Sequence, residues 1–290
     1  MFSGSIVALV TPFKNGQVDE EAFINLVEWH IANGTHGLVP CGTTGESATL
    51  THTEHQRLVK LCVETAAGRI PVIAGAGSNA TQEAVELAQH AQNCGADAIL
   101  VVTPYYNKPS QEGMYQHYKA IHNASDIPIV LYNVPSRTSV DLELETVYRL
   151  AELPRIIAIK DASPDLSRPL AMREKLGNEF CLLSGEDVTA LAYLAQGGDG
   201  CISVSANVAP GSCAEMQNAF KAGDIKRAQE LNKKLLPVHN AMFCETSPAP
   251  VKFGTSLLKL SEADVRLPLV SASERAQKQV HNTLQDIGVL

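Results

Sequence analysis

The chain has 290 residues, of which 45% are hydrophobic, and its formal net charge at pH 7 is -8. A chain of this length can bury a large core, either as one barrel-sized domain or as two smaller ones. Its acidic charge is spread along the sequence without a basic block, which argues against nucleic acid and anionic membranes as partners.

Eight short apolar runs predict β-strands that recur along the chain at intervals of roughly 20 to 35 residues, the size of one βα unit. Each run is nearly all apolar rather than alternating, as expected for parallel strands that are covered on both faces. The predicted strands lie at residues 6–11, 37–41, 71–75, 98–103, 129–132, 156–160, 181–184 and 201–205.

The segments between these runs predict amphipathic helices. Side chains at positions 23, 26, 27, 30 and 31 recur with helical spacing. Thr53, followed three residues later by Gln56, predicts a capping-box start. Gly95 and Gly177 are expected to follow helix ends.

This alternation predicts an α/β fold, a (β/α)8 TIM barrel, because eight βα units follow one another without a linker. A doubly wound open sheet is the alternative, since the same alternation permits it. We expect the catalytic barrel to occupy residues 1–224 and a C-terminal helical extension, suited to subunit contacts, to occupy residues 225–290.

The N-terminus and the cysteines indicate a soluble cytoplasmic protein. The first ten residues have no positively charged region, and their apolar run is too short for a signal peptide. The uncharged stretch at residues 200–214 is too short to span a bilayer. The seven cysteines are odd in number and widely spaced, which is typical of a reducing compartment.

Lys160 is the most informative single residue, because four apolar residues carry it to the end of a predicted buried strand. Burial disfavours the ammonium form and lowers the pKa, and a neutral amine is a nucleophile for carbonyl groups. The plainer alternative is a lysine that ends a strand and pairs with its neighbour Asp161.

Other polar side chains are expected at the same mouth, because the C-terminal ends of barrel strands converge there. Thr43 and Thr44 follow the second strand in a Gly-Thr-Thr-Gly turn, which can offer N–H groups and hydroxyls to a carboxylate. Tyr132, linked to Thr44, could move protons during imine formation, and Arg137 could hold a second carboxylate. Together they suit Schiff-base chemistry on a keto acid, although each alone also fits a structural role.

Two other patterns are weaker. Residues 75–80 imitate a dinucleotide fingerprint, but Asp97 precedes the next strand instead of ending it. His52 and His55 have the spacing of a metal pair but straddle a predicted helix start without a third ligand, so we expect no metal site. Cys41, beside the Gly-Thr-Thr-Gly turn, can be either reactive or simply buried.

Four ordered motifs, at residues 42–46, 132–138, 157–161 and 197–203, carry a resemblance over essentially the whole chain. The sequence resembles the 4-hydroxy-tetrahydrodipicolinate synthase (dihydrodipicolinate synthase) family of pyruvate-dependent class I aldolases. The resemblance implies a lyase that forms a Schiff base between Lys160 and pyruvate and joins it to L-aspartate 4-semialdehyde. The implied product is 4-hydroxy-tetrahydrodipicolinate, an intermediate of lysine and diaminopimelate biosynthesis. It implies no cofactor, because pyruvate is a covalently bound substrate.

The resemblance also assigns roles to residues at matching positions. It implies that Tyr132, Thr44 and Tyr106 form a proton relay, with Tyr106 reaching in from a neighbouring subunit of a homotetramer built as a dimer of dimers. Thr43 and Thr44 would bind the pyruvate carboxylate and Arg137 the semialdehyde carboxylate. Backbone at Gly185 and Ile202 would line the pocket.

Members of this family that are inhibited by L-lysine carry a further set of residues at the tight-dimer interface. In the ligand pocket implied here, Glu83 would pair with the amino group, Asn79 and Tyr105 would bind the carboxylate, and the histidines would shape the side-chain pocket. The alternative is an ordinary polar interface. The set consists here of Ser47, Ala48, His52, His55, Asn79, Glu83 and Tyr105.

Two alternatives remain for the function. Sibling enzymes, N-acetylneuraminate lyase and the keto-deoxy-sugar-acid aldolases, use the same lysine, but their sugar substrates suit neutral hydroxyl partners better than the cation of Arg137. A non-catalytic barrel that senses lysine would normally have lost the lysine nucleophile or a relay hydroxyl, and neither loss is seen.

Overall fold

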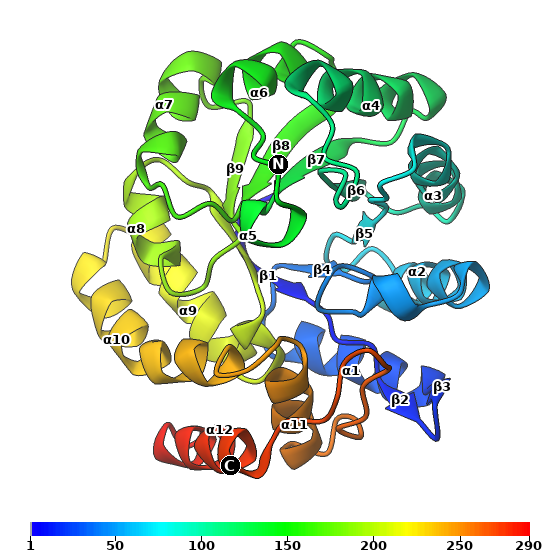
Figure 1. Cartoon of the computed structure of the whole chain (residues 1–290). Helices are drawn as coiled ribbons and strands as arrows, with labels where there is room; N and C mark the ends of the chain where they lie inside the picture. The colour runs from blue at the N-terminus through cyan, green and yellow to red at the C-terminus, as the bar shows by residue number, and fades with distance from the viewer. Residues whose placement is uncertain (1) are drawn as a thin grey trace.

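The computed structural model describes residues 2–290 and shows eight parallel strands arranged around a central axis, with helices outside them (Figure 1). All eight predicted strands are confirmed, with ends that differ by up to three residues. They are β1 (Gly4–Ala8), β4 (Gly37–Val39), β5 (Ile73–Gly75), β6 (Ala98–Val102), β7 (Ile129–Asn133), β8 (Ile156–Asp161), β9 (Cys181–Ser184) and β10 (Gly200–Ser203).

The sheet closes into a barrel, so the open doubly wound alternative is wrong. The hydrogen-bonded strand order is β4-β1-β10-β9-β8-β7-β6-β5. Its two ends meet, because Leu38 of β4 forms a parallel bridge with Val72, and its backbone N–H donates to the Pro71 carbonyl at 2.9 Å. Parallel strands that close in this way bring all their C-terminal ends to one mouth.

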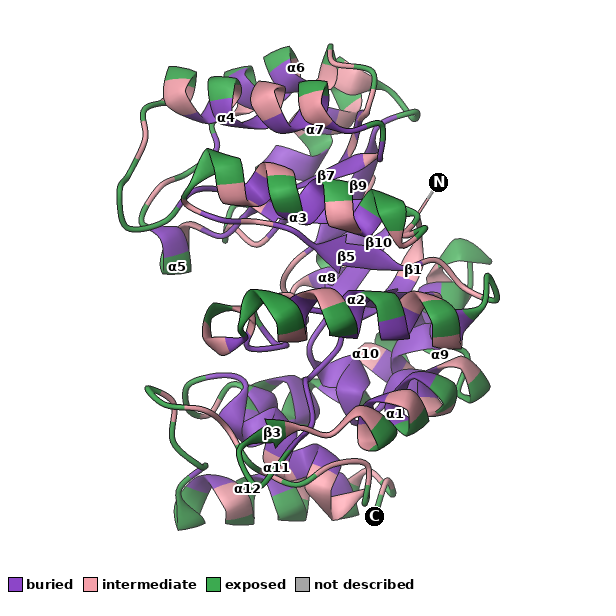
Figure 2. Cartoon of the chain, turned by 90° about the vertical axis from the view of Figure 1, so that its right-hand side faces the viewer, coloured by how far each residue is buried: buried purple, intermediate pink, exposed green. Residues whose placement is uncertain are grey.

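Helices cover the outside of the barrel and turn their apolar sides inward (Figure 2). The predicted periodicity is confirmed in the first helix, where Phe23, Leu26, Val27 and His30 are buried. The barrel helices are α1 (Glu20–Ala32), α2 (His52–Ala66), α3 (Thr81–Asn93), α4 (Gln111–Ala124), α5 (Pro135–Thr138), α6 (Leu144–Ala151), α7 (Ser167–Leu176), α8 (Ala190–Ala195) and α9 (Pro210–Lys221). Short elements are the β2–β3 hairpin (Phe13–Lys14 and Gln17–Val18) and the 3₁₀ turns η1 (Ser47–Thr49) and η2 (Ser205–Asn207).

The capping box of α2 lies two residues before the predicted position. The Thr51 hydroxyl accepts from the Glu54 N–H at 3.2 Å, and the Thr51 N–H donates to the Glu54 carboxylate at 2.8 Å. Thr53 therefore lies inside the first turn, and its assignment as the cap was wrong because both threonines have a partner three residues later. The predicted helix stops are confirmed, since Gly95 and Gly177 have φ values of 79° and 71°.

Three helices follow the barrel: α10 (Ile225–Met242), α11 (Ala249–Leu257) and α12 (Glu274–Asp286). They pack against one another, with α11 and α12 below the barrel in Figure 1 and α10 at its lower left, where α10 also packs along α9. We retain residue 224 as the proposed end of the barrel, because the Asp224 carboxylate caps α10 by accepting from the Arg227 N–H at 3.0 Å.

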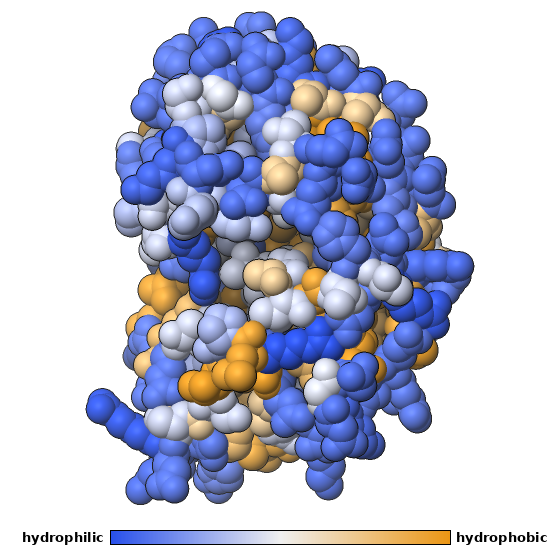
Figure 3. All heavy atoms as spheres, turned by 45° about the vertical axis from the view of Figure 1, so that its right-hand side comes forward, coloured by the Kyte–Doolittle hydropathy of each residue, from blue (hydrophilic) through white to orange (hydrophobic). Residues whose placement is uncertain are grey.

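Two apolar layers explain why the strands are nearly all apolar. One layer, which includes Ile6, Leu100 and Leu183, fills the barrel, and the other lies between strands and helices. The view in Figure 3 shows a surface that is mostly hydrophilic, as the outward faces of the helices predict. Within residues 2–290, no helix has the length and apolar character needed to cross a membrane.

Buried histidines give the fold a pH dependence. Burial lowers the pKa of His30 to about 3, and the pKa values of His55 and His117 to about 4, from the usual 6.5. The unfolded chain binds these protons near pH 6.5 and the folded chain does not, so the stabilisation is complete above pH 6.5 and is lost on acidification. We expect the free energy of unfolding to fall by roughly 2 kcal/mol per histidine between pH 6.5 and pH 5.

Urea denaturation at pH 7, 6 and 5, at fixed protein concentration, would measure this fall. A transition midpoint that stays constant across the three pH values would contradict the expected loss of stability.

Candidate active site

Two adjoining cavities open at the C-terminal mouth of the barrel. The first, which we name the Lys160 cavity, has a volume of about 400 Å³ and includes Lys160, Thr44, Tyr132 and Gly185 in its lining. The second, the His52 cavity, has a volume of about 480 Å³. Both are lined in part by the same three residues, Thr43, Arg137 and Ser247.

Lys160 projects from β8 and is only 5% exposed. It is paired with Tyr132 of β7 in the sheet, and its Nζ lies 4.2 Å from the centre of the Tyr132 ring. Asp161 is bound by the Arg168 guanidinium, with an Nε to Oδ2 distance of 2.7 Å. The structure therefore does not support the plainer explanation, in which Lys160 pairs with Asp161.

Because Gly185 has no side chain, the Lys160 side chain can occupy the space beside it. A Cβ atom at position 185 would lie 3.1 Å from Lys160 Cε and 2.7 Å from the Ala162 Cβ. The Gly185 N–H donates to the Asp161 carbonyl at 2.7 Å, which continues the β8–β9 pairing to the cavity wall. Any side chain at this position would press on the lysine.

The Gly-Thr-Thr-Gly turn closes on itself through backbone hydrogen bonds. The Gly45 N–H donates to the Gly42 carbonyl and the Glu46 N–H to the Thr43 carbonyl, both at 3.1 Å. The Thr11 hydroxyl holds the turn from β1's side by donating to the Gly45 carbonyl at 2.6 Å. This places Thr44, 5% exposed, on the Lys160 cavity, and Thr43 between the two cavities.

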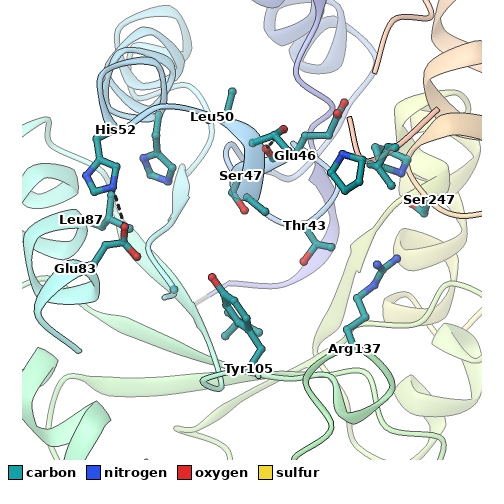
Figure 4. A pocket seen from close by; sticks show the side chains of 18 residues that line it. Thr43, Glu46, Ser47, Leu50, His52, Glu83, Leu87, Tyr105, Arg137 and Ser247 are labelled. Carbon is teal, nitrogen blue, oxygen red and sulfur yellow. Dashed lines mark hydrogen bonds and ion pairs between the residues drawn. The ribbon is translucent and has the colours of Figure 1, made fainter. Parts of the chain in front are cut away.

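Arg137 lies on α5, directly after β7, and borders both cavities. In the view of Figure 4 its guanidinium points toward the region between Thr43 and Ser247. No salt bridge within residues 2–290 involves this guanidinium. It is therefore available to an anionic ligand.

Two of the expected residues do not line the Lys160 cavity within one chain, although Ile202 was expected there through its backbone and Tyr106 from a neighbouring subunit. Ile202 is 1% exposed and packs in the apolar layer that fills the barrel. Tyr106 is 90% exposed and has a φ of 71°, in the left-handed region that a bulky residue rarely adopts. Within one chain, the expected relay contains only Tyr132 and Thr44.

Sequence reasoning assigned no role to Glu186 or Ser247, which also line the Lys160 cavity. Burial, reinforced by Asp187, raises the pKa of Glu186, whereas the charges of Lys160 and Arg137 oppose this rise. Its position two residues after the end of β9 was the signal that could have identified Glu186. Ser247 lies between α10 and α11 and is far along the chain from any strand. No local sequence pattern therefore identifies it as a residue of the site.

The His52 cavity gathers most of the residues expected to bind L-lysine (Figure 4). His52 Nε2 lies 2.8 Å from Glu83 Oε1, and the Ser78 hydroxyl donates to the other oxygen of Glu83. Burial, with a smaller contribution from Glu83, raises the pKa of Tyr105, so this hydroxyl stays protonated. Those of the expected set that line the cavity are Ser47, Ala48, His52, His55, Glu83 and Tyr105.

Asn79 is the one member of that set outside the cavity lining. Its side-chain amide donates to the Tyr105 backbone carbonyl at 3.1 Å, and its backbone carbonyl accepts from the Asn107 side-chain amide at 2.9 Å. Asn79 thus holds the loop that carries Tyr105.

The weaker sequence patterns have structural explanations. A Cβ at Gly75 would lie 2.1 Å from the Cys41 carbonyl oxygen, and one at Gly77 would lie 2.5 Å from the Val102 nitrogen, so these glycines permit close backbone approach. No group of three metal-ligating side chains occurs within residues 2–290. Cys41 is buried, and burial raises the pKa of its thiol well above the usual range, which describes an unreactive cysteine.

Comparison with known proteins covers the whole chain. The model of the dihydrodipicolinate synthetase family matches residues 1–287. The 4-hydroxy-tetrahydrodipicolinate synthase of Rhodospirillum centenum is 58% identical over 290 residues, which cover 100% of both chains.

Solved structures agree with this match. The structure of chloride-inhibited dihydrodipicolinate synthase from Acinetobacter baumannii, complexed with pyruvate, has a TM-score of 0.98 at 47% identity, covering 100% of both chains. The lysine-bound enzyme from Cyanidioschyzon merolae has a TM-score of 0.97 at 37% identity, covering 100% of this chain and 99% of that one. The chain therefore belongs to the dihydrodipicolinate synthetase family.

Proposed function

We propose that Lys160 forms an imine with pyruvate, and that the derived enamine condenses with L-aspartate 4-semialdehyde to give 4-hydroxy-tetrahydrodipicolinate. The chain is an enzyme of its family, a lyase. The observation that carries the mechanism is the buried Lys160 amine, which shares one cavity with Tyr132, Thr44 and the cation of Arg137.

The proposed steps balance without a cofactor. The Lys160 amine adds to the keto carbon of pyruvate, and the resulting carbinolamine loses water to give the imine. Loss of a methyl proton gives the enamine, whose carbon attacks the aldehyde carbon and leaves a hydroxyl there. The amino group of the semialdehyde then attacks the imine carbon, closes the ring and releases the lysine amine.

Polar groups around the cavity suit the two carboxylates of these substrates. The turn that carries Thr43 and Thr44 offers hydroxyls and backbone N–H groups to pyruvate, and Thr44 and Tyr132 can pass the protons that imine formation needs. Arg137, at the outer side, suits the semialdehyde carboxylate, because a guanidinium binds a carboxylate through two parallel hydrogen bonds.

The relatives favour this substrate pair over the sibling aldolases and over a non-catalytic barrel. The Rhodospirillum centenum relative is named for the synthase reaction, and the Acinetobacter baumannii structure holds pyruvate. We propose a place in lysine and diaminopimelate biosynthesis on the same ground. A cytoplasmic location is consistent with five cysteines that are buried as free thiols, in Cys41, Cys62, Cys181, Cys201 and Cys213.

Reductive trapping tests the proposed imine directly. Incubation with pyruvate and borohydride should add a reduced pyruvate group to one lysine, and peptide mass mapping should place it on Lys160. An assay with aspartate semialdehyde would then identify the second substrate. The absence of an adduct on any lysine would contradict the mechanism.

We further propose that Tyr106 completes the proton relay of a second copy of the chain, within a homotetramer. The exposed side chain and its left-handed backbone support this role, because a bulky residue is rarely held in such a conformation without a partner. Tyr106→Phe is expected to lower kcat by roughly 100-fold, the usual contribution of a positioned proton donor. Tyr115→Phe, on α4 and outside both cavities, is the control and should leave kcat within about twofold.

A mixing experiment tests whether Tyr106 acts across the subunit boundary. Lys160→Ala subunits carry an intact Tyr106, and Tyr106→Phe subunits carry an intact Lys160. Mixed oligomers should recover activity that neither variant has alone. If subunit exchange is complete and no activity returns, Tyr106 does not act in its partner's site.

We also propose that the His52 cavity binds L-lysine and that its occupation inhibits the enzyme. The Glu83 carboxylate suits the ligand's amino group, and the protonated Tyr105 hydroxyl suits its carboxylate. The lysine-bound structure of the Cyanidioschyzon merolae relative supports this ligand.

Glu83→Ala should raise the lysine concentration needed for half-inhibition by about 30-fold or more, because it removes a charged hydrogen-bond partner worth roughly 2 kcal/mol. Glu86→Ala is the control, because Glu86 lies on the exposed side of the same helix, where its carboxylate accepts from the Gln82 side chain at 3.0 Å. Inhibition curves at saturating substrate would compare the two. If lysine inhibits Glu83→Ala as strongly as the unaltered chain, the inhibitory site does not include Glu83.

A further inference from the structure

A buried ion pair joins the Gly-Thr-Thr-Gly turn to the C-terminal helices. Lys252 Nζ, on α11, lies 2.7 Å from Glu46 Oε1, and the side chains of Lys252 and Glu46 are 0% and 1% exposed. The two residues are 206 positions apart in the chain. Such a pair is costly to bury and is costly to break on one side only, so its presence at this place calls for an explanation.

Arg266, in the segment between α11 and α12, completes the cluster. Its backbone N–H donates to the second Glu46 oxygen at 3.0 Å, so both oxygens of this carboxylate are held by the C-terminal part of the chain. The Arg266 guanidinium binds Glu54 of α2 at 2.6 Å and the Thr49 carbonyl at 3.0 Å. Both cations lie over the Phe13 ring, whose centre is 4.0 Å from Lys252 Nζ and 4.3 Å from Arg266 Cζ.

Glu46 is also the residue that closes the turn. Its φ and ψ of 56° and 36° lie in the left-handed region, which residues with a side chain rarely adopt. Its N–H donates to the Thr43 carbonyl, and its carbonyl accepts from the Thr49 N–H at 3.0 Å. The position of this backbone therefore determines where Thr43 and Thr44 face the Lys160 cavity.

We propose that Glu46 and Lys252 are positioning residues, through which the C-terminal helical extension holds the carboxylate-binding turn of the barrel in place. This inference rests on the proposed function, in which that turn binds pyruvate. The pair touches no substrate. It acts by keeping Thr43 and Thr44 at the distance that the pyruvate carboxylate requires.

Lys252→Met, which keeps the length of the side chain and removes its charge, tests this role. The KM for pyruvate should rise about tenfold or more, because the turn binds the carboxylate before the reaction and during it. The KM for aspartate semialdehyde should stay within about twofold, because Arg137 lies on α5 and not on this turn. Lys252→Arg, which keeps the cation, should restore most of the affinity for pyruvate.

Two further variants separate positioning from general destabilisation. Glu46→Gln/Lys252→Met leaves no unpaired buried charge, so it should fold, and it should show the same defect in pyruvate KM. Arg173→Met breaks the Arg173–Asp199 ion pair, whose closest N to O distance is also 2.7 Å, just before β10 at the opposite end of the barrel. It should lower the melting temperature and leave both KM values unchanged.

Amide hydrogen exchange provides a readout that does not depend on activity. The N–H groups of Gly45, Glu46 and Ser47 donate within the turn, and they should exchange faster in Lys252→Met than in the unaltered chain. In Arg173→Met their exchange should be unchanged.

The outcomes distinguish this inference from the proposed function. If the unaltered chain traps no pyruvate, the proposed function fails, and the exchange of the turn amides still decides whether the pair positions the turn. If the unaltered chain traps pyruvate, a folded Lys252→Met protein with unchanged pyruvate KM and unchanged exchange overturns the inference. A pyruvate KM that rises equally in Arg173→Met, or that is normal in the double variant, would also overturn it.

Discussion

Lys160→Met is expected to lower kcat by about 10⁴-fold or more, in line with the loss seen when an enzyme's nucleophile is removed. Methionine has nearly the shape of lysine but no amine, so it fills the space beside Tyr132 and Gly185 without forming an imine. The variant should fold, because it replaces a 5% exposed amine by an apolar group of similar size. Steady-state kinetics with both substrates and a thermal melt would measure both effects.

Lys175→Met is a suitable control for this experiment. Lys175 is exposed on α7, and its substitution should leave kcat unchanged. Lys160→Met protein that folds and retains more than about a hundredth of normal kcat would show that the reaction does not pass through a lysine imine.

Arg137→Ala is expected to raise the KM for aspartate semialdehyde by about 100-fold and to change the KM for pyruvate by less than about threefold. The physical reason is that Arg137 makes no salt bridge with any residue from 2 to 290, so its removal breaks no ion pair that holds the turn of Thr43 and Thr44. Arg137→Lys keeps the charge but loses the two parallel hydrogen bonds, and about a tenfold rise is expected. Initial rates at varied concentrations of each substrate would measure these constants.

The trapped adduct serves as the control for Arg137. Borohydride should still fix pyruvate to Lys160 in Arg137→Ala, because imine formation precedes semialdehyde binding in the proposed mechanism. An equal rise in the KM values of both substrates would show that Arg137 does not bind the semialdehyde carboxylate specifically.

The strands were predictable because a parallel strand that is covered on both faces must be apolar along its whole length. Their C-terminal ends then follow from barrel geometry, and this was enough to bring Lys160, Tyr132, Thr44 and Arg137 to one mouth. The helix start at Thr51 was missed because Thr53 satisfies the same capping spacing, and only the three-dimensional structure separates the two.

The remaining parts of the mouth depend on contacts between distant parts of the chain. Ser247 and Lys252 come from the C-terminal extension, whose helices pack on the barrel through side chains that have no periodic relation to the strands. Tyr106 carries no local signal of chemistry, since an exposed tyrosine in a loop is ordinary until a second copy is considered. Its proposed role depends on family resemblance.

The wall shared by the two cavities limits how regulation and chemistry can diverge in evolution. A substitution at Thr43, Arg137 or Ser247 alters both cavities at once. Selection at these positions for loss of lysine inhibition would therefore also alter catalysis. Desensitised variants that keep full activity should therefore accumulate at positions that face the His52 cavity alone, such as His52 and Glu83. The regulatory response can then drift between lineages while the reaction stays constant.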